Sequence, residues 1–509
     1  MASSFNHHIP ERSVSSTTEN VAESRGVSID DTSKTAGAEK PALTLPPVIP
    51  SGHQHRTLVL CFDGTGDQFD NDNSNIVQFV SLLKKDDRQK QCVYYQTGIG
   101  TYTGSNRSVS IFKSGIRKII DTMFAHSIDA HIMGGYKFLM QNSSQVCFTK
   151  LPPSNSEQVP FAYTMYLRTD GVGWEQANEF KRAFSINVEI EFLGVWDTVG
   201  SIGFKPWGLP FATCNRFIKT YRHAVSLDER RAKFQVNLWN KPSDEEAKLG
   251  LHEHQEGNGK PETDIKEVWF AGCHCDVGGG SVSNTTENSL ARIPLRWMVR
   301  EVFRTNAGIL FLTDRLPEIG LNPSTIYPVV LDRPDPRSVK TGKISEPLPT
   351  EYPTRPSAFS IWGKPINNVT SIKRRKIFLS EEDEELKDAL SPIHDQMVIK
   401  PWWWLFEYLP LPLRRQWGPK GEWDTSIRCL PNRGSARAVD QSNGKRLKVH
   451  RSVKMRMDAE YEDEHKRRKR QKYRPGVLTH PEGSWLFQLG VKTGLLNQAP
   501  DFVDPEWVE

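Results

Sequence analysis

Two segments of the sequence place an acid and a histidine where catalytic residues occur in enzymes. Asp197 opens the segment Asp-Thr-Val-Gly and His274 lies within Gly-Cys-His-Cys-Asp, and each segment follows an apolar run that predicts a strand. An acid followed later in the chain by a histidine is the second half of the order Ser, Asp or Glu, His. In that chemistry the histidine takes the proton of the nucleophile, and the acid fixes its tautomer and stabilises the imidazolium. We therefore predict Asp197 as the acid and His274 as the base, and a buried histidine in a tight turn is the alternative for His274.

A third predicted strand also ends in a polar loop, Asp63-Gly64-Thr65-Gly66. Backbone N–H groups of such a loop are suited to an oxyanion that develops during acyl transfer, so we predict Asp63, Gly64 and Thr65 as an active-site loop. An Asx-type turn is the alternative for Asp63 itself. Asp276 is a competing choice for the acid, but it lies two residues from His274. We assign it a supporting role in the glycine-rich turn that follows.

The elements that must position these residues alternate between strands and helices. Apolar runs predict strands at 57–62, 92–95, 188–196 and 268–271, and helical spacing predicts helices at 75–84, 109–124, 128–140, 223–234 and 290–303. This alternation predicts an α/β fold with a mostly parallel sheet and helices on both faces. Because the carboxyl ends of parallel strands meet at one edge of a sheet, we expect the Asp197 carboxylate within about 2.6–3.2 Å of a His274 ring nitrogen.

Composition shifts divide the 509 residues into five parts. Residues 1–54 are rich in Ser, Thr, Glu, Pro and His and are predicted to be disordered. The α/β domain is expected over 55–330, a linker or long loop over 331–380, a C-terminal extension packed on the domain over 381–475, and a tail over 476–509. A charged helix is predicted at 381–390.

Charge and cysteine usage narrow the functional classes. A formal net charge of +5 is too small for this length to predict nucleic-acid binding, and seven cysteines without framework spacing favour a reducing compartment. We find no leader and no apolar run of about 18–20 residues, so we predict no transmembrane segment and a cytoplasmic location. The basic run Lys466–Lys472 is of the nuclear-localisation type, although we favour a solvated charged helix as its explanation. No cofactor is predicted, and protein partners and oligomeric state are left open.

The most aromatic stretch runs from Trp402 to Pro410, with three consecutive tryptophans. Tryptophan and tyrosine are enriched at membrane interfaces, which is one interpretation of this stretch. A short apolar helix docked on the main domain is the other.

Three further motifs are set aside on chemical grounds. The strand before Asp63 resembles the start of a haloacid-dehalogenase phosphatase, but Cys61 occupies the position of the nucleophilic aspartate. The run 70–75 lacks the glycine and glutamate of a calcium loop. Cys273, His274 and Cys275 are too closely spaced to converge on one zinc ion, and no second cluster accompanies them. No metal site is predicted.

Five segments, in order, resemble one known family. They begin at Leu60 (Leu-Cys-Phe-Asp-Gly-Thr-Gly), Tyr95 (Tyr-Gln-Thr-Gly-Ile-Gly-Thr), Phe192 (Phe-Leu-Gly-Val-Trp-Asp-Thr-Val-Gly), Ser226 (Ser-Leu-Asp-Glu-Arg-Arg-Ala-Lys-Phe) and Val268 (Val-Trp-Phe-Ala-Gly-Cys-His-Cys-Asp-Val-Gly-Gly-Gly). The family is an uncharacterised α/β-hydrolase domain family that includes phospholipase effectors of bacterial type VI secretion, and the chain resembles a fungal-type member from about residue 56 to 311. The resemblance implies an α/β-hydrolase fold, a lipid or ester substrate, and a Ser-Asp-His site in which Asp197 and His274 match the acid and the base.

The sequence departs from this family at the nucleophile. Members carry Gly-Phe-Ser-Arg-Gly-Ala between the segments that match Tyr136-Lys-Phe-Leu and Glu157-Gln-Val-Pro-Phe-Ala-Tyr, whereas Gly-x-Ser-x-Gly occurs nowhere in this chain. A strand, an elbow and a helix need about 20–30 residues from typical element lengths, and that room is absent. The chain therefore lacks a coding segment or is a pseudoenzyme that binds rather than cleaves, and the nucleophile is unknown.

The short segment 145–149 is the one candidate strand for the gap, and it would present Thr149 or Ser154 in place of an elbow serine. Without the elbow strand, two neighbouring strands are expected to expose unpaired backbone. The native substrate is not defined by the sequence.

Overall fold

The computed structural model describes residues 45–99, 128–142, 151–185, 190–200, 218–239, 262–339, 380–409, 431–440, 446–461, 472–480 and 505–509, with the short strands 343–344, 415–417 and 422–424, apart from positions 53–54 and 169. The predicted helix at 109–124, the segment 145–149, the predicted disorder before residue 45 and most of the basic run at 466–472 lie outside these residues.

The strands are β1 (Val48–Ile49), β2 (Thr57–Phe62), β3 (Gln91–Gln96), β4 (Ile190–Trp196), β5 (Ile218–Ser226), β6 (Asp264–Phe270), β7 (Phe311–Leu312), β8 (Lys343–Ile344), β9 (Arg415–Trp417), β10 (Glu422–Asp424), β11 (Ala438–Asp440), β12 (Lys448–His450), β13 (Glu460–Tyr461), β14 (Leu478–His480) and β15 (Glu506–Val508).

The helices are α1 (Asn75–Leu82), α3 (Ile128–Asn142), α4 (Val159–Tyr166), α5 (Gly171–Phe184), α7 (His274–Gly278), α8 (Arg292–Arg304), α9 (Glu381–Ala389), α10 (Gln396–Ile399), α11 (Trp404–Tyr408) and α12 (Arg451–Asp458). Short 3₁₀ helices are η1 (Pro153–Gln158), η2 (Thr313–Ile319), η3 (Pro323–Thr325) and η4 (Pro401–Trp403).

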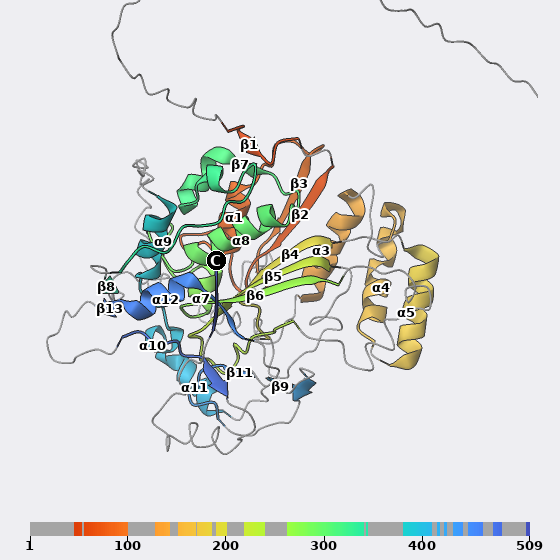
Figure 1. Ribbon diagram of the computed structural model, residues 1–509. Helices are drawn as coiled ribbons and strands as arrows, with labels where there is room; N and C mark the ends of the chain where they lie inside the picture. Colours follow the sequence, from red (N-terminus) through yellow and green to blue (C-terminus); the bar gives the residue numbers. More distant parts are fainter. Residues whose placement is uncertain are drawn as a thin grey trace, which may run out of the picture. The chain divides into compact units, whose positions relative to one another are not determined.

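The main sheet has five strands in the order β15-β12-β6-β5-β4, and every neighbouring pair in it is parallel (Figure 1). This arrangement confirms the predicted α/β class with a parallel sheet. The two outer strands on one side, β12 and β15, come from the C-terminal part of the chain. The sheet that carries the candidate site is therefore completed by residues far from it in sequence.

The first two parallel strands form a sheet of their own. β2 pairs with β3 in parallel register from Thr57–Gln91 to Phe62–Gln96, and within the described residues neither strand pairs with β4. β4 ends the larger sheet, and none of its seven residues is fully buried. Unpaired edges are the expected consequence of a missing strand between β2 and β4.

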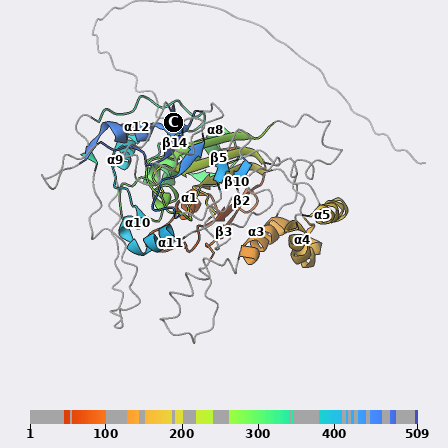
Figure 2. The same cartoon turned by 90° about the horizontal axis from the view of Figure 1, so that it is seen from below.

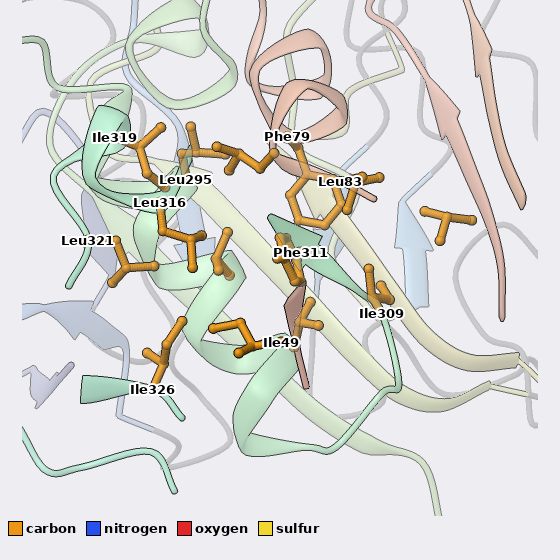
Figure 3. Packing of buried hydrophobic residues seen from close by; sticks show 14 of the residues in the cluster. Ile49, Phe79, Leu83, Leu295, Ile309, Phe311, Leu316, Ile319, Leu321 and Ile326 are labelled. Atoms are coloured by element: carbon orange, nitrogen blue, oxygen red, sulfur yellow. The ribbon is translucent and has the colours of Figure 1, made fainter. Parts of the chain in front are cut away.

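One hydrophobic core nevertheless joins β2 to β4. Val59 and Cys61 of β2, Phe79 of α1 and Phe311 of β7 belong to the same buried cluster, and Trp196 of β4 packs against it. Figure 3 shows Phe79 and Phe311 within this cluster. The rings of Phe79 and Trp196 lie edge to face with centroids 6.1 Å apart. Burial of these apolar side chains holds the two sheets together although, in the part of the chain that the structure describes, their backbones do not pair.

α1 begins where polar groups cap it. The Ser74 side chain accepts a hydrogen bond from Val77 N, and Asn75 Nδ2 donates to Val277 O at 2.8 Å and Ala291 O at 2.9 Å. Gly279 passes so close that a Cβ there would lie 2.4 Å from Asn75 N. The start of α1 is thus fixed against α7 and α8.

α8 and α9 are joined by buried ion pairs rather than by apolar contact alone. Arg296 contacts Asp388 at 2.6 Å and Arg300 contacts Glu381 at 2.8 Å, with all four side chains almost fully buried. Pairing and hydrogen bonding offset part of the desolvation of these charges. Four acidic residues of the helix predicted at 381–390 therefore lie inside the protein: Glu381, Glu384, Glu385 and Asp388.

One predicted helix is wrong. Residues 223–226 belong to the buried strand β5, and 227–234 form turns rather than a helix. The charged run 228–231 gave the segment its amphipathic spacing, but Glu229 and Arg231 are buried and pair with each other at 2.8 Å. A helix prediction from sequence periodicity assumes that charged side chains face water, whereas Glu229 and Arg231 lie inside the protein.

No helix among the described residues combines the length and the apolar character needed to cross a bilayer.

Candidate active site

Asp197 lies directly after β4, at the carboxyl end of the sheet, and is fully buried. Its φ is 43°, a left-handed conformation that is uncommon for a residue with a side chain. Asp197 N donates to Ala224 O at 2.7 Å, and Asp197 Oδ1 accepts from Ser226 N at 2.9 Å. The neighbouring strand β5 therefore fixes both the backbone and the carboxylate of Asp197.

His274 is the first residue of α7, which follows β6 after a sharp turn. Gly272 in this turn has a φ of 109°, and a Cβ at that position would lie 2.4 Å from Asp276 Cβ. The turn directs the His274 ring toward the end of β4. His274 Nδ1 lies 2.6 Å from Asp197 Oδ2, a distance within the expected range.

The ring of His274 is supported by an aromatic neighbour and has one nitrogen free to act. Its centroid lies 5.0 Å from that of Phe234 in an edge-to-face arrangement, and the His274 side chain is 27% exposed. Among the described residues, Nε2 has no hydrogen-bond partner. In a Ser-His-Asp arrangement this is the nitrogen that takes the proton of the nucleophile.

Arg437, from the C-terminal part of the chain, holds the Asp197 carboxylate with both ends of its guanidinium. Nη1 contacts Oδ1 at 2.6 Å and Nη2 contacts Oδ2 at 2.9 Å, and the Arg437 side chain is 1% exposed. Burial by itself raises the pKa of the Asp197 carboxyl. The Arg437 charge and the hydrogen bonds from His274 and Arg437 outweigh burial and hold that pKa well below its usual range.

Arg437 also ties the site to its surroundings. Its guanidinium donates to Ser226 Oγ at 2.8 Å and to Phe234 O at 2.6 Å. The arginine therefore joins the acid, the end of β5 and the residue beneath the His274 ring. Nothing in the sequence near residue 437 marks it as part of the site, because its role depends on a contact 240 positions away.

A second buried ion pair lies on the other side of His274. Glu229 Oε2 accepts from His274 N at 3.3 Å and pairs with Arg231. The Arg231 guanidinium lies 3.5 Å from the centroid of the Phe234 ring, and cation–π contact adds to the support of that ring. These residues belong to the segment that begins at Ser226, whose resemblance to the family was the available signal for them.

Asp276 is placed as a structural residue. It is almost fully buried, accepts from Cys273 N at 3.0 Å, and accepts from both the backbone and the ring of His394, the latter at 2.8 Å. It caps α7 and fixes the segment before α10. It does not contact His274 through its side chain.

The Asp63 loop is organised by its own carboxylate. Asp63 accepts from Ser74 Oγ at 2.5 Å and from Tyr95 Oη at 2.7 Å, and Gly64 N donates to Asp63 Oδ1 at 2.9 Å. Of the residues predicted as an active-site loop, Thr65 has a backbone N–H without a partner among the described residues. Thr65 is thus the remaining oxyanion candidate there.

The structure describes one of the two hydroxyl groups considered as nucleophiles. Thr149 lies outside the described residues. Ser154 belongs to η1, and its hydroxyl contacts Asn155 Oδ1 at 3.5 Å. Across the described ranges, no group of three or more His, Cys, Asp or Glu side chains is arranged to hold a metal ion.

Comparison with known proteins gives one family, one relative and two partly similar solved structures. Residues 56–149 and 147–301 match the family described as T6SS, Phospholipase effector Tle1-like, catalytic domain. The uncharacterized protein YEL023C of Saccharomyces cerevisiae is 24% identical over 544 residues, which cover 77% of this chain and 78% of the yeast protein. The two family segments meet at residues 147–149, within the stretch that lacks the elbow.

Two solved structures are similar to part of the chain. One is an uncharacterized protein from Pseudomonas aeruginosa, with 17% identity, a TM-score of 0.28, and coverage of 55% of this chain and 50% of that one. The other is the Tle1 effector bound to the VgrG spike from the type 6 secretion system, with 16% identity, a TM-score of 0.24, and coverage of 45% and 52%. This chain therefore spans about half the length of each.

Proposed function

We propose that this protein descends from hydrolases of lipid or carboxylic esters. The premise is that residues 56–301 belong to the family of Tle1-like phospholipase effector catalytic domains. It retains the acid Asp197 and the base His274 of a Ser-Asp-His site and has no working nucleophile in the sequence as it stands. The observation that carries the proposal is the 2.6 Å contact between His274 Nδ1 and Asp197 Oδ2. This contact leaves His274 Nε2 without a partner among the described residues, so that nitrogen can take the proton of an attacking hydroxyl.

Burial of the acid supports this assignment. A carboxylate held charged by Arg437 fixes one tautomer of His274, with the proton on Nδ1. In that tautomer Nε2 carries a lone pair and can accept the proton of an attacking hydroxyl. The pair is therefore equipped as a general base, and only the group that it would activate is missing.

Three observations support the loss of the nucleophile. The sequence contains no Gly-x-Ser-x-Gly. The match to the family breaks at residues 147–149. Finally, β2 and β4 end separate sheets although their side chains share one core. A segment that supplied both a central strand and the elbow would account for all three.

The same observations favour a second candidate, a catalytically inactive protein that binds a partner or a lipid through the retained site. A transcript sequenced across the codons for Met140 to Leu151 separates the two. An additional in-frame segment with a serine elbow would return the protein to the active hydrolases. An uninterrupted transcript would favour the binding protein.

Activity of the chain as given provides the direct test. Without the serine, binding and oxyanion stabilisation leave about 10³–10⁴-fold acceleration over water in the best-studied triad enzyme, and enzymes typically reach about 10⁶-fold or more. We expect purified, folded protein to show no acyl-enzyme burst and no labelling by a fluorophosphonate probe. His274→Ala should change ester turnover little. Stoichiometric labelling that disappears in His274→Ala would contradict the proposed loss of the nucleophile.

A further inference from the structure

The segment from α10 through η4 to α11 and the following Leu409 exposes several large apolar side chains. Met397 and Glu407 are its buried residues. The exposed ones, which we call the aromatic face, are Val398 (66%), Trp402 (46%), Leu405 (65%), Tyr408 (60%) and Leu409 (38%). Such a concentration within twelve consecutive residues differs from the single exposed apolar residues common on protein surfaces.

Part of the aromatic face follows helical spacing. Trp402, Leu405 and Tyr408 are three residues apart within the run from η4 into α11, an interval that places side chains on one side of a helix. Val398 belongs to α10, and Lys400, with a φ of −128° and a ψ of 80°, interrupts the helical path between α10 and η4. Figure 1 shows α10 and α11 next to each other, and η4 joins them. Trp402, Leu405 and Tyr408 therefore share one side of the run from η4 into α11, and Val398 is exposed on the adjoining helix α10.

The polarity of this segment is the reverse of that of an ordinary surface helix, in which apolar side chains face the core and charges face water. Glu407 of α11 is 1% exposed. Its carboxylate accepts from Ala232 N at 2.6 Å, from Asn432 Nδ2 at 2.6 Å and from Gly434 N at 3.0 Å. The charge thus anchors α11 to the protein and holds its apolar side outward.

We propose that the aromatic face docks on the surface of a membrane that contains anionic phospholipids. Tryptophan and tyrosine favour the boundary between hydrocarbon and water. Among the described residues, two exposed charged residues near the face, Lys400 and Arg433, are basic, and basic groups near a membrane are attracted to anionic headgroups. A face that is apolar at its centre and basic at its border matches the chemistry of such a surface.

The aromatic face also lies next to the candidate active site. The Trp403 ring stacks on Trp402 with centroids 4.3 Å apart, and it contacts Phe234 at 5.6 Å. Phe234 in turn supports His274. A membrane bound to the face would therefore meet the protein close to the Asp197–His274 pair. Figure 2 shows α10 and α11 from below. The choice of a phospholipid surface rests in part on the proposed function, whereas the burial of Glu407 and the exposure of the apolar side chains do not depend on it.

Co-sedimentation of the full chain with vesicles tests the proposal. One vesicle preparation contains phosphatidylcholine alone and the other contains phosphatidylcholine with about a quarter of phosphatidylserine, which supplies the anionic headgroups. We expect binding to the second preparation that is at least tenfold tighter than to the first. Trp402→Ser/Leu405→Ser/Tyr408→Ser should weaken it at least tenfold, and Lys400→Glu should remove the preference for phosphatidylserine.

Two further variants make the result specific. Val398→Glu/Leu405→Glu places charges on the face without altering the tryptophan stack, and it should lose binding. This variant provides the test if the triple variant fails to fold. Val329→Ser/Leu331→Ser changes two other exposed apolar residues (66% and 53%) and should bind as the wild type does. Absence of wild-type binding, or equal binding by the charged variant, would overturn the proposal. So would a wild-type dimer that the charged variant dissociates, because a second copy would then cover the face.

Vesicle binding needs no turnover, so the two proposals fail separately. Binding without fluorophosphonate labelling is the result expected from both together. Labelling without vesicle binding would refute the docking surface and the proposed loss of the nucleophile. Labelling with binding would refute the proposed loss of the nucleophile alone.

Discussion

Replacement of Arg437 by methionine tests how the acid of the candidate site is held. Methionine keeps much of the apolar stem of arginine but removes its charge and donors. Asp197, which is fully buried, would lose both contacts of its carboxylate with the guanidinium. His274 and the Ser226 amide would remain as its hydrogen-bond partners.

The expected loss of stability is large because Arg437 is removed from a buried ion pair and its partner Asp197 stays. Such changes destabilise proteins by about 3–5 kcal/mol, out of a typical total of about 5–15 kcal/mol. Arg437→Lys retains the charge but not the two-pronged contact, so we expect an intermediate loss. Asp197→Asn/Arg437→Met should be less destabilised than the sum of the single changes, because the two residues interact directly.

The loss should depend on pH. In the wild type the pKa of Asp197 lies well below its usual range. The stability that its ionisation contributes is therefore fully present above a pH of about 4, the pKa of an unfolded aspartate, and it is lost only as pH falls through the lower folded pKa. In Arg437→Met burial acts without the arginine and raises the pKa of Asp197. Protonation of Asp197 then removes the buried charge. The difference in free energy of unfolding between Arg437→Met and the wild type should therefore become smaller between pH 7.5 and pH 5.

Urea unfolding followed by tryptophan fluorescence at these two pH values measures the effect. Arg315→Met is the matched control, because Arg315 pairs with Glu318 at the surface, where their side chains are 42% and 48% exposed. An exposed pair contributes about 0–1 kcal/mol. A loss below about 1 kcal/mol in Arg437→Met, or an equal loss at both pH values, would refute the reasoning.

Two further predictions concern turns beside the site. Burial raises the pKa of Asp228 to about 6, although the hydrogen bonds that Asp228 accepts oppose this shift. Because the folded pKa is raised, the free energy of unfolding should fall as pH rises from about 4 to about 6. Asp228→Asn should reduce this slope in unfolding experiments over the same pH range. Gly279 has a φ of 88° and lies against Asn75, so Gly279→Ala should lower the free energy of unfolding by about 1–3 kcal/mol. The control Gly52→Ala has a similar φ of 81° but open space around it, and a loss as large in this variant would show that the contact with Asn75 is unimportant.

Local patterns in the sequence were sufficient for most elements of the α/β domain. The strands expected at 57–62 and 268–271 and the helix expected at 290–303 agree with β2, β6 and α8 within a few residues. Short apolar runs that end in glycine, and long amphipathic runs, depend on neighbours along the chain. Such signals can be read without the tertiary structure.

Long-range pairing decided the features that sequence reasoning missed. The run 223–234 has charges at helical spacing, but a central position beside β6 makes its first part a strand, and Glu229 and Arg231 pair with each other inside the protein. The β12 and β15 strands are three residues each and gain their place in the sheet from pairing alone. Propensity over three residues is too weak to predict such elements.

The sequence by itself determined the residue types of the candidate site and their order: an acid after one strand, a histidine after another, and no serine elbow between the matching segments. The tertiary structure decided the contact of Asp197 with His274, the part of Arg437 in holding the acid, and the outward direction of the aromatic face. The reason is physical. Spacing along a chain fixes which side chains share a strand end or a helix face, whereas the charge state and exposure of a side chain depend on partners that folding brings from hundreds of residues away.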